Sequence, residues 1–122
     1  MPVWTMAPIS GSWMRTPMKN ASDSLVTTTY KVDGASLTMT DAMGDTYTAK
    51  MDGTEAPEKG NAGVTSVTVN KMGPHTILET DMRNGKAIET IKSTVARGGN
   101  KMTVVDNDMQ RHRVTTYTAN KQ

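Results

Sequence analysis

Short runs of alternating apolar and polar residues dominate this chain, and they are clearest between Gly63 and Asp106. In that stretch, four runs rich in Val, Ile and Thr are separated by NKMGP, RNGK and RGGN. Gly and Asn in these separators tolerate the positive φ that tight hairpin turns require. The runs recur about every ten residues, and none keeps the i, i+3, i+4 spacing of a core-facing helix. The pattern therefore predicts consecutive antiparallel hairpins and an all-β chain.

The same alternation continues on both sides of that stretch. We expect strands over residues 9–15, 24–32, 35–43, 45–52, 64–71, 75–82, 86–97, 101–106 and 113–120. Residues 53–62 (GTEAPEKGNA) interrupt the series, and their Gly, Pro and charged residues predict the longest loop. Within the strands, apolar residues such as Leu37 and Met39 share one face. That arrangement is typical of a sheet with one buried face.

A meander of this length has to curl, because a long twisted sheet with unpaired edges aggregates. Closure into an up-and-down barrel of about 8–10 strands removes the edges, and the interior of such a barrel is either filled or holds one small ligand. We expect residues 1–8 to form an irregular lead-in and residues 9–122 to form a single barrel domain. A sandwich or an open curved sheet is the alternative.

The composition of this 122-residue chain indicates which residues fill its core and which classes of partner are not expected. Hydrophobic residues make up 35% of it, Phe is absent and Met occurs 11 times, so we expect Met to fill much of the core. The absence of Cys excludes disulfides and thiolate chemistry. Charges are interspersed, with a net charge of +2, and aromatic residues are few. Nucleic acid is therefore not an expected partner.

No apolar run approaches the roughly 20 residues that cross a bilayer, so we expect no membrane span. The first residues, MPVWTMAPIS, lack the basic start and the apolar core of a signal peptide. We expect an exported protein, periplasmic or secreted, whose signal peptide is absent from this sequence, and a cytoplasmic location stays open. We also expect a monomer or a weak dimer.

The pattern G-x-W at Gly11–Trp13 resembles the opening signature of lipocalins and their calycin relatives. From TTTYKVDG (residues 27–34) through TILET (76–80) and STVARGGNKMTV (93–104) to the terminal YTANKQ, the chain resembles small bacterial lipocalin-like proteins of uncharacterised function. This resemblance implies a calycin-type barrel. Fatty-acid-binding relatives carry an Arg-x-Tyr clamp, whereas Arg113 and Tyr117 lie four residues apart, about 13 Å along a strand.

The leading functional hypothesis is a carrier that binds a small apolar or amphipathic molecule inside the barrel. Aromatic and Met side chains would supply apolar contact, and one Arg would anchor an anionic head group. The residues expected to line or close the cavity are Trp13, Tyr30, Met39, Tyr47, Met51, Arg113 and Tyr117. We expect no catalytic residue, no metal site and no cofactor.

Two other classes of function stay open. A small barrel enzyme of the isomerase, lyase or hydrolase type would use His75, His112 or Arg113 in the same cavity. A filled barrel would instead act as a structural or interaction module. The two histidines, with Asp106 or Asp108 as a third ligand, do not match the spacing of an established metal site.

Glu79, Asp81 and Glu89 are the candidates for a carboxyl pair, because they can meet across the RNGK turn. The alternation alone does not decide which face of residues 75–82 is inward, since Ile77 and Leu78 point to opposite faces. The pattern favours an outer-face arrangement in which these carboxylates pair with Lys86 and Lys92.

Overall fold

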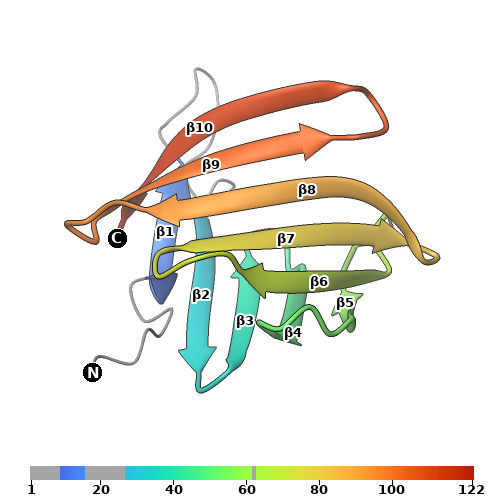
Figure 1. The fold of residues 1–122 in the computed structure, drawn as a ribbon, viewed down its shortest axis with the longest axis horizontal. Coiled ribbons are helices and arrows are strands. Elements are labelled where there is room, and N and C mark those ends of the chain that lie inside the picture. Colours follow the sequence, from blue (N-terminus) through green and yellow to red (C-terminus); the bar gives the residue numbers. More distant parts are fainter. Residues whose placement is uncertain (1–8, 16–26, 62) are drawn as a thin grey trace.

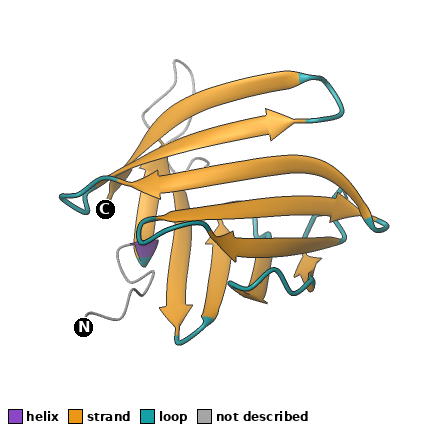
Figure 2. Cartoon of the chain, viewed as in Figure 1, coloured by secondary structure: helices purple, strands orange, loops and turns teal. Residues whose placement is uncertain are grey.

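The structure, a computed structural model, describes residues 9–15, 27–61 and 63–122 (Figure 1). Nearly all of these residues lie in strands or in the short turns between strands, and the one helical turn described is at Ile9 (Figure 2). The predicted lead-in over residues 1–8 and the first residues of the predicted strand 24–32 lie outside the described ranges. The strands are β1 (Gly11–Arg15), β2 (Thr27–Asp33), β3 (Ser36–Asp41), β4 (Thr46–Lys50), β5 (Ala56–Lys59), β6 (Ser66–Lys71), β7 (Thr76–Arg83), β8 (Lys86–Val95), β9 (Lys101–Asp108) and β10 (Arg113–Lys121).

These strands form one antiparallel sheet that closes on itself. Each strand pairs with the next along the chain, and β1 pairs with both β2 and β10. In Figure 1, β6 to β10 run across the view, whereas β1 to β3 run steeply to them. The closed meander confirms the predicted all-β, up-and-down barrel, and it is compatible with a lipocalin-like barrel.

One strand was missed by the sequence pattern. β5 lies inside the stretch predicted as a loop, and it joins the sheet through few pairs, among them Tyr47↔Glu58 with β4 and Ala56↔Val67 with β6. Pro57 removes a backbone donor from this strand, and β5 contains no β-branched or aromatic residue. Pairing with β4 and β6 holds these residues in an extended conformation. The local sequence of β5 does not encode that pairing.

Two positions, one at the start of β1 and one in a hairpin turn, have backbone conformations that explain their residues. Gly11, the first residue of the G-x-W pattern, has φ 121, a region that side chains with a Cβ rarely adopt. A Cβ there would also lie 2.9 Å from the Cε of Lys121, on the strand that closes the barrel. The predicted hairpin turn between β7 and β8 has Asn84 at φ 51 and Gly85 at φ 82, as a type I′ turn requires.

The core differs from the expectation that Met fills much of the interior. Of the described methionines only Met39 and Met102 are buried, and Met43 is 70% exposed. Val, Ile and Leu side chains supply most of the buried surface, together with Trp13. The Trp13 indole is 2% exposed, and its Nε1 donates a hydrogen bond to the Ile9 carbonyl oxygen at 2.8 Å.

The barrel has two ends, because antiparallel strands in sequence order place successive turns alternately. The turns after β3, β5, β7 and β9 lie at one end, which we call the mouth end. The turns after β2, β4, β6 and β8 lie at the opposite end, which we call the far end.

Replacing Trp13 with Ala removes the bulkiest of the fully buried side chains. We expect the free energy of unfolding, measured by urea denaturation, to fall by about 3–5 kcal/mol because a cavity remains. The control Val114→Thr keeps a β-branched side chain at a position that is 64% exposed, and we expect it to change stability by no more than about 0.5 kcal/mol. A Trp13→Ala effect as small as the control's would contradict this packing.

Candidate functional site

The barrel encloses a cavity of about 260 Å³. It includes Met43 in its lining, and because Met43 is largely exposed, this part of the cavity reaches the surface at the mouth end. The described residues that line the cavity are Trp13, Thr27, Thr28, Tyr30, Met39, Asp41, Met43, Asp45, Glu58, Asn61, Glu79, Asp81, Ile91, Ser93, Met102, Val104, Tyr117 and Ala119.

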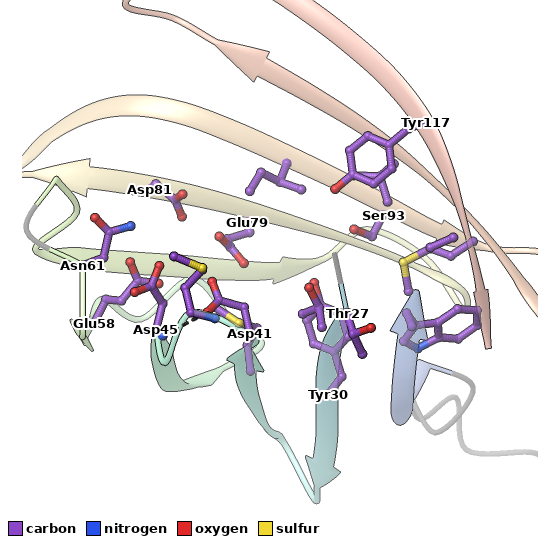
Figure 3. Close-up of a pocket in the computed structure, with 18 residues that line it drawn as sticks. Thr27, Tyr30, Asp41, Asp45, Glu58, Asn61, Glu79, Asp81, Ser93 and Tyr117 are labelled. Atoms are coloured by element: carbon purple, nitrogen blue, oxygen red, sulfur yellow. Dashed lines mark hydrogen bonds between the residues drawn. The ribbon is translucent and has the colours of Figure 1, made fainter. Parts of the chain in front are cut away.

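The lining has an acidic side and an apolar side. Figure 3 shows Asp41, Asp45, Glu58 and Asn61 gathered toward the side where Asp81 lies, with Glu79 next to them. Strands β1, β2, β9 and β10 supply the apolar side, mainly with aromatic, Met, Val and Ala side chains. A cavity of this kind suits a molecule with one polar and one apolar end.

The acidic side depends on the inward face of β7. Ile77, Glu79 and Asp81 are 1%, 5% and 6% exposed, so the two-residue period of the strand carries both carboxyls into the barrel with Ile77. The expectation that these carboxylates lie on the outer face with lysines is wrong. The register of a closed barrel fixes the inward face, and the core position of Ile77 takes Glu79 and Asp81 with it.

The buried carboxyl groups contact one another. The Tyr47 hydroxyl donates a hydrogen bond to Glu79 Oε1 at 2.5 Å. Glu79 is hydrogen-bonded to Asp81, Asp81 to Glu89 on the paired strand β8, and Glu89 to Asp106 on β9. A carboxylate has no donor, so each carboxyl–carboxyl bond requires that one partner holds a proton. We call this row from Tyr47 to Asp106 the carboxyl chain.

Burial explains why these protons stay. It raises the pKa of Glu79 well above its usual range, and the neighbouring Asp81 adds to the effect. Burial also raises the pKa of Asp81. The pKa of Glu89 rises to about 9, through burial and then through Asp106, and that of Glu58 rises to about 7, through burial and then through Asp81. Desolvation of the charged form is the leading cause throughout.

No cation of the lining offsets the acidic side: none of the described lining residues is Lys, Arg or His. The ion pair that the structure shows near the mouth end, Arg111 to Asp108 at 3.8 Å, is largely exposed and lies outside the lining. One oxygen of Asp81, Oδ1, is buried without a hydrogen-bond partner in the described structure.

The residues predicted to bind a ligand fall into two groups. Trp13, Tyr30, Met39 and Tyr117 line the cavity. Tyr47 is buried behind the lining and reaches the cavity through Glu79, Met51 is half-buried against the core, and Arg113 is exposed at the start of β10. Their part in binding stays a prediction, but Arg113 does not lie beside the other residues.

The two histidines lie at opposite ends of the barrel, and neither is among the described residues that line the cavity. His75 lies in the turn between β6 and β7, at the far end, and His112 lies in the turn between β9 and β10, at the mouth end. A joint catalytic or metal site that includes both is therefore excluded by the topology. Within the described residues no group of three His, Cys, Asp or Glu side chains is arranged to hold a metal ion.

Sequence reasoning missed most of the acidic side. Asp41 follows Leu37 and Met39 on the inward face of β3, so the alternation contained a signal for it. Asp45 precedes Tyr47 and Ala49 on one face of the predicted strand 45–52, so the alternation contained a signal for it too, although β4 begins one residue later. Glu58 gave no such signal, because it lies in the strand that was read as a loop.

No protein-family model, no curated protein and no solved structure matches the chain. Among the residues whose structure is described, no helix is long and apolar enough to cross a membrane.

The carboxyl chain predicts an unusual dependence of stability on pH. In the unfolded chain the carboxyls of Glu58, Glu79, Asp81 and Glu89 ionise near pH 4, whereas burial raises their pKa values in the folded barrel, so they keep their protons to higher pH. Their contribution is therefore fully present below about pH 4 and is lost as the pH rises through the folded pKa values, about 7 for Glu58 and about 9 for Glu89. We expect the free energy of unfolding to fall by a few kcal/mol between pH 5 and pH 9, after allowing for the partial exposure of these two groups.

Glu79→Gln isolates the deepest member of the chain, because Gln can accept from Tyr47 and donate to Asp81 without titrating. We expect a shallower decline with pH and a higher stability than wild type at pH 9 in urea denaturation. Asp33→Asn, at an exposed position on β2, is the control and should follow the wild-type profile. A Glu79→Gln profile parallel to wild type would show that Glu79 does not hold its proton.

Proposed function

We propose that this protein is a lipocalin-like carrier that binds one small amphipathic molecule inside its barrel. The observation that carries the proposal is the barrel cavity of about 260 Å³, which has an apolar side and an acidic side. The G-x-W opening and the resemblance to small bacterial lipocalin-like proteins support the same reading. We propose further that the protein is exported and acts as a monomer or a weak dimer.

The size of the cavity limits the ligand. A volume of about 260 Å³ is equivalent to about nine water molecules at ~30 Å³ each, and it lies just below the usual range for drug-sized ligands. A ligand with on the order of ten non-hydrogen atoms fits this space. The cavity also counts against a fully filled barrel that serves only as a structural module.

An enzyme that transfers a proton is the second candidate, because Glu79 holds a proton inside the cavity, as a general acid must. Glycoside hydrolysis is disfavoured, since Glu79 and Asp81 are hydrogen-bonded to each other and lack the gap that this chemistry needs between its carboxyls. The separation of the histidines removes them as joint partners. Binding without chemistry is therefore the simpler account.

Isothermal titration with three probes of matched size tests the proposal: 2-phenylethylamine, 2-phenylethanol and phenylacetate. Ala119 is 4% exposed and lines the apolar side, so Ala119→Leu should fill part of the cavity. Thr116→Leu adds the same side chain at an exposed position of the same strand and is the control.

We expect at least one probe to bind wild type and Thr116→Leu with a Kd below about 1 mM, and Ala119→Leu to bind it at least tenfold more weakly. This loss follows from the volume that the Leu side chain takes from the ligand. Absence of binding by all three probes, or equal binding by Ala119→Leu, would refute the carrier proposal.

A further inference from the structure

The described lining of the cavity contains several carboxyl groups and no basic side chain. Five carboxyl side chains belong to the lining: Asp41, Asp45, Glu58, Glu79 and Asp81. They come from β3, the turn after it, β5 and β7, so segments distant in the sequence converge on one region. The lining residues that the structure describes contribute no positive charge to balance them. An anionic head group would find no cation to pair with in this lining, and Arg113 is exposed outside it.

Asp81 gives a second and independent indication. Its side chain is 6% exposed, and its Oδ1 atom is buried with no hydrogen-bond partner in the described structure, which leaves the bonds to Glu79 and Glu89 to its other carboxyl oxygen. Figure 3 shows the Asp81 and Glu79 carboxyls directed into the cavity. A buried acceptor without a partner is costly, and a bound donor removes that cost. The missing donor is a group that a ligand can bring.

The apolar side defines the rest of the ligand. Trp13, Tyr30 and Tyr117 present aromatic surface to the cavity, and Met102 and Ala119 complete it. An alkyl or aromatic group packs against such a lining, and a nearby ammonium gains further from the aromatic faces. The two sides together favour a cation with an apolar body.

We propose that the cavity binds a small primary amine, whose ammonium donates hydrogen bonds to Asp81 Oδ1 and to the Glu79 carboxyl while its apolar body packs against the apolar side of the lining. This inference rests on the proposed carrier function and names the class of its ligand. An ammonium supplies three donors and a positive charge, which matches an unpaired carboxyl oxygen among carboxyl groups.

Binding of an ammonium is also expected to change the number of protons bound to the protein. When Glu79 or Asp81 gives its proton to solvent, the resulting carboxylate pairs with the ammonium, so one proton is released for each amine bound. The described charged and titratable groups around this pair are all acidic or phenolic: Tyr30, Asp41, Asp45, Tyr47, Glu58, Glu89, Asp106 and Tyr117. None of them is an amine or an imidazole that would take up the released proton at neutral pH, so the proton goes to solvent.

Isothermal titration at pH 7 with the same three probes tests the inference, because the probes share one apolar body and differ in charge. We expect 2-phenylethylamine to bind at least tenfold more tightly than 2-phenylethanol and phenylacetate. Titration in two buffers of different ionisation enthalpy should show net proton release with the amine and none with the alcohol.

Asp81→Asn removes the anchoring charge, and Asp108→Asn removes the same charge outside the cavity lining at the mouth end. We expect Asp81→Asn to weaken the amine about 10- to 100-fold, the range of a lost charge-assisted hydrogen bond. The alcohol should bind Asp81→Asn as it binds wild type, and Asp108→Asn should bind both probes within about twofold of wild type.

The outcomes separate the two proposals. If the alcohol or the acid binds wild type as tightly as the amine, the amine inference is wrong while the carrier proposal stands. If the three probes fail together, the carrier proposal fails first. If Asp81→Asn does not fold, the order of the probes on wild type and the proton release still decide, and an amine that binds without proton release and without preference overturns the inference.

Discussion

Closure of the sheet between β1 and β10 is the constraint on which the rest of this structure depends. It is made through a short register, from Trp13↔Lys121 to Arg15↔Ala119, and it converts an open meander into a barrel with an interior. Without closure, the inward face of β7 would be in contact with water, and Glu79 and Asp81 would be ordinary surface acids. With closure, water is largely excluded from them, and desolvation decides their protonation.

Burying Glu79 and Asp81 inside the barrel reduces the stability of the fold. Carboxyl groups buried without a cation stabilise a fold less than apolar side chains of similar volume would. The cost is reduced by the hydrogen bond from Tyr47 to Glu79 and by the bonds between the carboxyls themselves. The interior departs from an apolar core in this place, while Ile77, Val67 and Leu37 follow the rule elsewhere, and such departures are expected at functional or strained sites.

Much of the fold could be predicted from the chain alone. Alternation along residues such as Leu37 and Met39, and turns such as Asn84–Gly85, are local signals that the barrel uses directly. β5 could not be predicted, because its pairing is imposed by its neighbours and Pro57 conceals it.

The candidate site was predictable only in part, because long-range strand pairing determines part of it as well. Its aromatic members follow from the alternation, because large apolar side chains on the inward face of a strand point into the interior of the barrel. Its acidic members do not, because the choice between the inward and outward face of β7 depends on the register of the closed barrel. Polar residues follow the backbone's period even where burial disfavours them.

The most direct test of this account is the protonation of Glu79 in the folded protein. An NMR titration of the side-chain carboxyl carbons, assigned with Glu79→Gln, measures it without any ligand. The account predicts that the Glu79 resonance keeps its protonated position well above the pH at which an exposed Glu titrates. A Glu79 carboxyl that titrates near pH 4, as in an unfolded chain, would contradict the closed and desolvated interior from which the carboxyl chain and the proposed ligand follow.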